Sequence, residues 1–383
     1  MIATKLYKDF FESKKSGGLV LIAFTIVSLC ITNSSFGNSY INSLDTVLAG
    51  LTIEHWINDG LMTIFFLLIG LELEREIYKG ELSNIKDALP PIFGALGGMI
   101  FPAAIFLIFN FNTSTQSGSG IPTATDIAFA LGILSLLGNR VPTSLKIFLT
   151  ALAVIDDLGA IIIIAVFYTK TILWTNLLIS LGVFALLLVL NRLKVNKLLP
   201  YLIGGVVMWF FMLHSGVHAT ITGVLLAFAI PFGNGGKKST SYVLQHFLHK
   251  PVSFIIMPIF ALANTAIIIG SDFNTIITQN YSIGIALGLI IGKPLGIITT
   301  LFLAVKLKIC QLPHEINWKS ILGVGFLAGI GFTMSIFITL LAFENETIIN
   351  NSKFIILLSS LIAGFIGFMT LKVTLKENYQ EED

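Results

Sequence analysis

Long apolar stretches separated by short polar segments recur along the chain from residue 17 to residue 375. They run to about twenty residues, the length that an α-helix needs to cross the roughly 30 Å hydrocarbon layer of a bilayer. Twelve stretches are predicted to be spans, at residues 17–35, 56–78, 89–110, 120–138, 145–168, 173–191, 198–213, 216–232, 243–268, 282–304, 320–343 and 351–373. We therefore expect an all-α polytopic membrane protein with 12 transmembrane helices, in which residues 1–383 form a single transmembrane domain.

Composition supports this expectation. Hydrophobic residues make up 55% of the 383 residues and charged residues only 11%, whereas soluble domains carry about 25% charged residues. A water-soluble fold would leave too much apolar surface in contact with water. The formal net charge of +2 gives no indication of nucleic-acid binding, so the expected surroundings are a lipid bilayer.

Basic residues favour one side of the predicted membrane. Twenty of the 23 lysines and arginines fall in the N-terminal segment and in every second loop, whereas only Lys170 and Lys353 fall on the opposite side. Cytoplasmic loops of membrane proteins carry such an excess of basic residues. We therefore predict that both termini are cytoplasmic and that the number of spans is even.

Two predicted spans are suited to interruption. The fourth opens with the polar, proline-containing run Ile121–Asp126, and the eleventh carries Gly329 and Gly331 near its middle. Paired interruptions in two halves of a transporter indicate its binding site, because backbone freed inside a membrane must be satisfied by protein or by a watery cavity. Residues 89–168 and 282–373 each place such a span between two continuous ones and start on opposite sides. We therefore expect these two segments to be inverted repeats forming a core, with the remaining spans as interface and scaffold.

Four ionisable residues lie inside predicted spans, where each charge costs at least about 2.5–3.5 kcal/mol. They are Asp126, Asp156, Asp157 and Lys293. One reading is that they form ion pairs that hold helices together. However, three acids against one base leave negative charge unpaired, and such a carboxylate either takes a proton or recruits a cation. Sodium prefers oxygen ligands, and Asp156, Asp157, the Thr125 hydroxyl and freed carbonyl groups would supply them.

The remaining two charged residues have more than one possible role. Lys293, followed by Pro294, is expected either to neutralise whichever aspartate is empty or to carry a proton itself. Asp126 is expected to offset the positive end that an interrupted helix points into the membrane, although a purely structural role is the alternative.

Four sequence motifs carry a resemblance to a known family. They are Thr125-Asp126-Ile127-Ala128-Phe129-Ala130-Leu131-Gly132, Ala153-Val154-Ile155-Asp156-Asp157-Leu158-Gly159-Ala160, Gly292-Lys293-Pro294-Leu295-Gly296 and Gly329-Ile330-Gly331-Phe332-Thr333-Met334-Ser335. In this order, and across nearly the whole chain, they resemble NhaA-type sodium/proton antiporters.

The resemblance implies a fold and an activity. Spans four and eleven would be discontinuous and would cross each other. The protein would be a secondary active transporter and not an enzyme, exchanging entering protons electrogenically for leaving sodium or lithium, with activation at alkaline pH. No cofactor is expected. A bacterial inner membrane is the expected location. The first outer loop, about residues 38–53, is long enough to form a short hairpin, and the resemblance implies that it helps to make a homodimer.

The resemblance also assigns roles to individual residues. Asp157 would be the principal cation-binding aspartate, and Asp156 would pair with Lys293. Asp126 would compensate charge at the broken helix. Asp59, in Trp56-Ile57-Asn58-Asp59, would be an accessory acid near the outer end of the second span.

Four further residues are candidates for the pH response, namely Glu72, His218, His246 and His249. His218 has the alternative of being an ordinary side chain at the end of a span. Gln245 stands where well-studied members carry a glutamate, so this chain lacks one titratable acid beside the two histidines. The other charged residues around Glu72, at Glu74, Arg75, Glu76, Lys79 and Glu81, are expected to form a solvated face.

Two other classes of protein also use buried acids. An intramembrane aspartyl protease needs two aspartates on separate helices, whereas Asp156 and Asp157 are adjacent. A passive cation channel normally builds its acids into a ring around an oligomeric pore. Only an exchanger releases protons from liposomes when sodium or lithium is added, so one assay separates the three.

Overall fold

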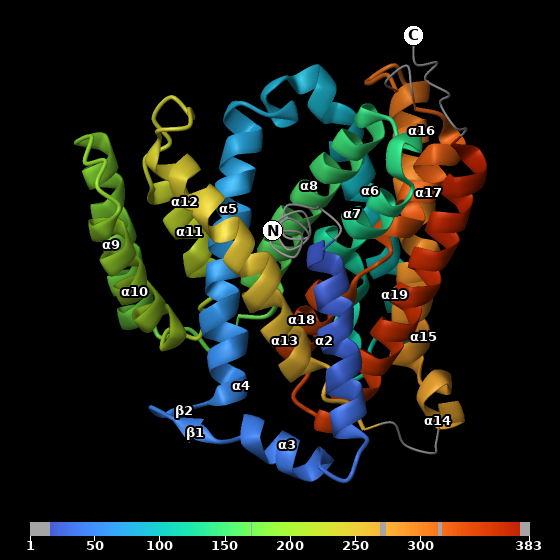
Figure 1. Cartoon of the computed structure of the whole chain (residues 1–383), viewed down its shortest axis with the longest axis horizontal. Coiled ribbons are helices and arrows are strands. Elements are labelled where there is room, and N and C mark those ends of the chain that lie inside the picture. The colour runs from blue at the N-terminus through green and yellow to red at the C-terminus, as the bar shows by residue number, and fades with distance from the viewer. Residues whose placement is uncertain (1–15, 170, 269–272, 313–315, 376–383) are drawn as a thin grey trace, which may run out of the picture. The chain divides into compact units, whose positions relative to one another are not determined.

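The computed structural model describes residues 16–169, 171–268, 273–312 and 316–375 (Figure 1). Among the described residues, eight helices are long and apolar enough to cross a membrane, or up to ten if each of two bent helix pairs counts as one span. The chain is therefore a helical, multi-pass membrane protein. Six of the basic residues that were used to assign sides, and both predicted cytoplasmic termini, lie outside the described residues: Lys5, Lys8, Lys14, Lys15, Lys170 and Lys376.

The chain divides into two compact units, each built from segments distant in sequence. The first unit comprises Met1–Ala23, Asn84–Ala160 and Ile267–Asp383, and the second comprises Phe24–Ser83 and Ile161–Ala266. Helices α2 (Ser16–Thr32) and α8 (Thr143–Phe167) begin in the first unit and end in the second.

The other elements of the first unit are helices, with η marking 3₁₀ and π segments. They are α6 (Ile85–Asn110), η3 (Gln116–Thr123), α7 (Ile127–Leu136), η4 (Gly138–Arg140), α14 (Phe273–Thr278), α15 (Asn280–Leu287), η6 (Gly288–Gly292), α16 (Lys293–Lys306), α17 (Trp318–Ala328), α18 (Phe332–Ala342) and α19 (Glu346–Thr374).

The second unit adds one two-stranded hairpin to its helices. Its elements are α3 (Gly37–Leu44), β1 (Val47–Leu48), β2 (Leu51–Thr52), α4 (Ile53–His55), η1 (Trp56–Leu61), α5 (Met62–Tyr78), η2 (Glu81–Ser83), α9 (Trp174–Arg192), α10 (Leu199–Leu213), α11 (Ile221–Ala229), α12 (Thr240–Pro251), η5 (Val252–Ile256) and α13 (Met257–Asn264).

Close helix packing in the first unit depends on glycine. Figure 1 shows α6, α16, α17 and α19 running side by side. Where α6 meets α16, a Cβ on Gly97 would overlap the carbonyl group of Gly296, and a Cβ on Gly296 would overlap that of Gly97. Small residues allow such close approach between membrane helices.

Both segments that were predicted to be interrupted are broken in the structure. Before α7, the 3₁₀ helix η3 ends at Thr123 and residues 124–126 are not helical. Between α17 and α18, residues 329–331 separate two helices bent by 47°. The Asp126 N–H donates to the Ile330 carbonyl at 2.7 Å, so backbone groups freed by one break are satisfied by the other.

The second unit contains the predicted hairpin and a tightly packed helix pair. Strands β1 and β2 pair antiparallel around Ala49 and Gly50, both with positive φ, as in two-residue hairpin turns. A Cβ on Gly223 of α11 would overlap the Thr63 carbonyl of α5, which explains how closely these two helices pack.

Two predicted spans differ from the observed helices. The stretch 17–35 ends as α2 at Thr32, and the pair α2 and α3 is bent by 116°. The amide of Asn33 donates to the Leu29 carbonyl and the Ser34 hydroxyl to that of Ile31, and such bonds compete with helix continuation. The stretch 216–232 is α-helical only over Ile221–Ala229, after a turn in which Gly216 has φ +86°.

Candidate functional site

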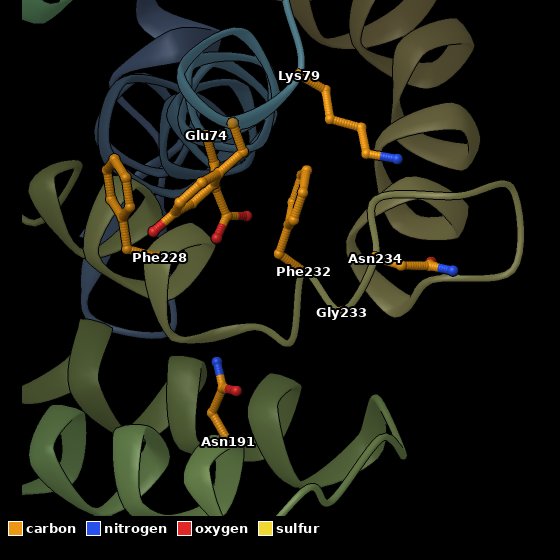
Figure 2. A pocket seen from close by; sticks show the side chains of 8 residues that line it. Glu74, Lys79, Asn191, Phe228, Phe232, Gly233 and Asn234 are labelled. Carbon is orange, nitrogen blue, oxygen red and sulfur yellow. The ribbon is translucent and has the colours of Figure 1, made fainter. Parts of the chain in front are cut away.

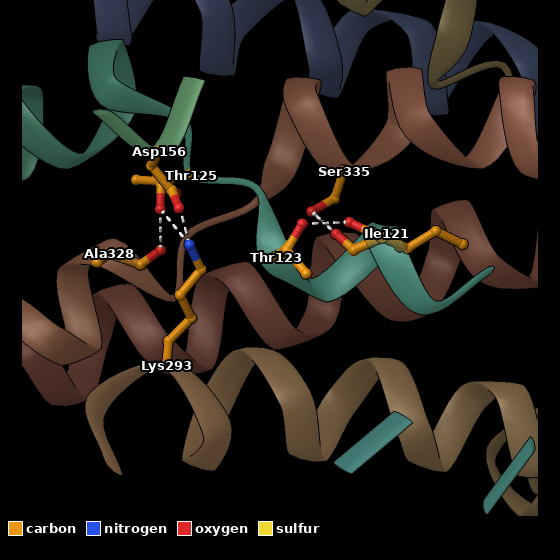
Figure 3. Close-up of polar contacts among 8 residues, drawn as sticks. Ile121, Thr123, Thr125, Asp156, Lys293, Ala328 and Ser335 are labelled. Atoms are coloured by element: carbon orange, nitrogen blue, oxygen red, sulfur yellow. Dashed lines mark hydrogen bonds and ion pairs between the residues drawn. The ribbon is translucent and has the colours of Figure 1, made fainter. Parts of the chain in front are cut away.

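Lys293 is the centre of the buried polar cluster in the first unit. It begins α16 directly after the π-helical turn η6, within one continuous helix over Asn280–Lys306, where Pro294 removes a backbone N–H from the helical hydrogen bonds. The side chain is 0% exposed. Its Nζ donates to Asp156 Oδ2 at 2.5 Å and to Thr125 Oγ1 at 2.9 Å (Figure 3).

Asp156 and Asp157 lie within α8, each only 1% exposed. Consecutive helical residues differ by about 100° in direction, so only one of them faces the ammonium directly. That residue is Asp156. Among the described residues its second oxygen, Oδ1, accepts no hydrogen bond.

Thr125 connects this ion pair to the second break. Its hydroxyl accepts from Lys293 and donates to the Ala328 carbonyl at 2.7 Å. In η3, before the non-helical residues 124–126, the Ile121 carbonyl accepts from the Ser335 hydroxyl of α18 at 2.7 Å (Figure 3). Side-chain hydroxyls therefore satisfy carbonyl groups that the breaks leave without helical partners.

Asp126 serves the start of two helices at once. As the N-cap of α7, its Oδ1 accepts from the Phe129 N–H at 3.0 Å. Its Oδ2 accepts from the Thr333 hydroxyl at 2.5 Å and from the Thr333 N–H at 3.3 Å, in the first turn of α18. A carboxylate is favourable at the positive N-terminal end of a helix, and this one faces two such ends.

A sodium ion in this cluster would need ligands beyond carboxylates. Within the described ranges, no three histidine, cysteine, aspartate or glutamate side chains lie close enough together to hold a metal ion. The two aspartates of α8 would therefore share the ion with carbonyl, hydroxyl or water oxygens, the ligands that hard cations accept.

Asp59 belongs to the second unit and has local partners. It lies in the π-helical segment η1, where its Oδ2 is 2.8 Å from Nε2 of His55. Its backbone carbonyl accepts from the indole N–H of Trp209 at 3.3 Å. The structure thus pairs this acid with a histidine that the sequence analysis had not selected.

Three of the four pH-response candidates lie around Arg75 at the C-terminal end of α5. Arg75 donates to Gln245 Oε1 at 3.0 Å and lies 4.4 Å from the ring centroid of Tyr242, on which His246 stacks. His249 Nδ1 is 3.7 Å from Glu72 Oε1.

The fourth candidate has its own position in the second unit. Nε2 of His218 lies 2.9 Å from the Tyr168 carbonyl oxygen, between the end of α8 and the start of α11.

One prediction about the C-terminal end of α5 was wrong. Glu74 was expected on a solvated face, but its side chain is only 4% exposed. It follows Gly70 by four residues and Leu71 by three, and both of these are buried. Helical spacing therefore gave a signal that Glu74 faces inward, which the surrounding charged residues obscured.

The fold and the buried charges define the class of the protein. A multi-pass helical membrane protein that keeps ionisable side chains where two broken segments meet has the characteristics of an ion transporter. The chain matches the sequence profile of the family described as Na+/H+ antiporter 1 over residues 8–371.

Three relatives named Na(+)/H(+) antiporter NhaA match nearly end to end. The protein of Flavobacterium psychrophilum is 72% identical over 100% of this chain and 99% of its own. That of Cytophaga hutchinsonii is 62% identical over 100% and 99%, and that of Dechloromonas aromatica is 59% identical over 96% of each. The chain belongs to the Na+/H+ antiporter 1 family, which is a family of transporters.

Proposed function

We propose that the protein is an electrogenic antiporter that exports Na+ or Li+ in exchange for imported protons, by competition of the two ions at Asp156 and Asp157. Family membership supports Na+/H+ exchange. The observation that carries the competition is the buried pair of Lys293 and Asp156, beside a second buried aspartate. Because these two acids lie beside one lysine, gain or loss of a cation or a proton changes the charge balance of the cluster.

The exchange follows from this charge balance. In the ion-free state Lys293 neutralises Asp156 while Asp157 holds a proton. When Na+ arrives, it displaces that proton, and Lys293 gives up its own proton and withdraws from Asp156 and Thr125, whose oxygens become ligands. Return of one proton to Asp157 and one to Lys293 restores the ion pair and expels Na+. Two protons then move for each Na+, which makes the exchange electrogenic.

The proposal includes an architecture. Twelve spans contain inverted repeats at residues 89–168 and 282–373, and the discontinuous spans four and eleven cross at Asp126. The contacts of Asp126 with the starts of α7 and α18 support this crossing, because a shared carboxylate compensates both helix ends. Alternating access then moves the site from one side of the bilayer to the other.

We further propose that the protein is a homodimer in the bacterial inner membrane, with cytoplasmic termini. The hairpin supports the dimer, since Val47 and Leu48 of β1 are 65% and 62% exposed. Glu72, His218, His246 and His249 are proposed to contribute to activation at alkaline pH, and Asp59 is proposed as an accessory acid. The contact between Glu72 and His249 supports a charge-dependent role, because it is an ion pair only when the histidine is protonated.

The test is an exchange assay on proteoliposomes with a preset pH gradient, acidic inside, repeated over a pH series. We expect Na+ or Li+ added outside to release protons from the lumen, in liposomes containing the protein and not in empty ones. Proton release that does not depend on either cation contradicts exchange. Cation uptake without proton movement would indicate a channel.

A further inference from the structure

A cavity of about 490 Å³ lies in the second unit at the C-terminal end of α5. Its lining includes Glu74 and Tyr78 from α5, Asn191 from α9, Phe228 from α11 and Phe232 from the loop that follows α11. The volume is in the range of small-molecule sites, which are mostly apolar with a few polar groups. None of these residues belongs to the proposed exchange site.

Glu74 is the unusual member of this lining. Among the described residues, its buried Oε2 accepts no hydrogen bond, and no basic side chain pairs with it. Figure 2 shows its carboxylate between Phe228 and Phe232, with Asn191 opposite and the Lys79 ammonium directed away. A buried carboxylate without a partner is unfavourable unless it meets a proton or a cation.

The surrounding helices also favour a cation. Glu74, Asn191 and Phe228 all lie in the last turn or so of their helices, which end at Tyr78, Arg192 and Ala229. The C-terminal end of a helix carries partial negative charge. Three such ends therefore border the cavity, together with the Glu74 carboxylate.

The aromatic rings indicate which kind of cation fits. A metal ion needs several oxygen ligands and is best held by more than one carboxylate, whereas this lining combines a single carboxylate with three aromatic rings, those of Tyr78, Phe228 and Phe232. Ammonium groups bind to carboxylates through N–H groups and to the faces of aromatic rings through their charge. Phe232 is held in place, since its ring packs on that of Tyr78 and fills the space beside Gly235, whose φ is +62°.

We propose that this cavity binds a small organic ammonium compound, with Glu74 accepting its N–H groups and the rings of Phe228 and Phe232 facing its charge. Lys79 lies at the rim and opposes a purely cationic ligand by repulsion. The proposal is independent of the exchange mechanism.

The test is calorimetric titration of the purified full-length protein with benzylamine, which is cationic at neutral pH, and with benzyl alcohol as the neutral probe. We expect saturable binding of the amine only. Glu74→Gln should weaken it about tenfold or more, since a charged hydrogen bond is lost, and Phe232→Leu should weaken it several-fold. Lys79→Gln should tighten it, because the repulsion disappears.

Two controls make the result specific. Glu81→Gln removes an exposed carboxylate from the neighbouring segment η2 and should bind the amine like the unaltered protein. Asp157→Asn should also retain binding. The proposal is overturned if the unaltered protein shows no saturable binding, if Glu74→Gln binds equally well, or if only Asp157→Asn loses binding, which would place the amine at the exchange site. Should Glu74→Gln not fold, unchanged affinity in both Phe232→Leu and Lys79→Gln overturns it instead.

Discussion

Asp157 is the residue on which the proposed exchange depends most directly. Asp157→Asn removes the charge and the proton site while keeping nearly the same shape, so we expect exchange to be abolished and insertion and folding to remain largely intact. The measurement is sodium-dependent proton release from proteoliposomes. Asp45→Asn, at an exposed position after α3, is the matched control and should exchange normally. Sodium-dependent release at the original rate in Asp157→Asn would remove this residue from the site.

The two aspartates of α8 should make sodium affinity depend on pH. Raising the pH removes the competing protons, so apparent Na+ affinity should tighten by about tenfold per pH unit for each competing proton. It should level off once the site has lost the protons that compete with Na+. Calorimetry at a series of pH values checks this, and an affinity that is constant across the series would contradict direct competition.

Individual residues were predictable where a charge stands alone in an apolar stretch. Asp126, Asp156, Asp157 and Lys293 were selected on that basis, and the contact between Lys293 and Asp156 is present. The double role of Asp126 was not predictable, because Thr333 is 207 residues away in sequence.

The burial of Glu74 was not predictable in this way. The residue stands among other charged residues, so local hydropathy favoured a solvated position. Its burial against α11 depends on tertiary packing.

At the scale of elements, the crossing of α6 and α16 yields a stability prediction. Gly97→Ala should lower the free energy of unfolding by about 1–3 kcal/mol, because the added methyl group forces the helices apart. Gly182→Ala, in α9, is the matched control, since a Cβ there meets nothing within 4 Å. It should stabilise the helix by up to about 1 kcal/mol. Thermal unfolding of the two purified variants measures the difference, and equal midpoints would contradict the role of Gly97.

The presence of a helix in a given stretch was more predictable than its exact length or the π-helical turns within it. Apolar stretches of sufficient length identify helices because the bilayer demands such lengths, and helices occur in all twelve predicted ranges. The π-helical turns η1, η5 and η6 have no such signal, since one additional residue in a turn leaves hydropathy unchanged. The shortness of α11 likewise follows from the turn at Gly216 and its contact with the Thr171 carbonyl, not from composition.

At the scale of the whole molecule, electrogenic exchange predicts a response to membrane potential. In the proteoliposome assay, the released protons carry excess positive charge outward, and the resulting potential, negative inside, slows exchange. Potassium on both sides with valinomycin removes this potential, so sustained sodium-dependent proton movement should become several-fold faster. Liposomes without valinomycin are the control. An identical rate under both conditions would indicate electroneutral exchange.

The π-helical turn η6 determines the direction in which the Lys293 side chain points. A π turn holds one residue more than the α turn it replaces, and here it directly precedes Lys293, with Gly292 packed against Pro102 and Gly288 against Pro122. If this turn became α-helical with all of its residues kept, the two halves of the helix would rotate by about 100° relative to each other. A protein rewound in this way would keep every ionisable side chain, yet its lysine would point to lipid or its preceding helix would present the wrong face to its neighbours.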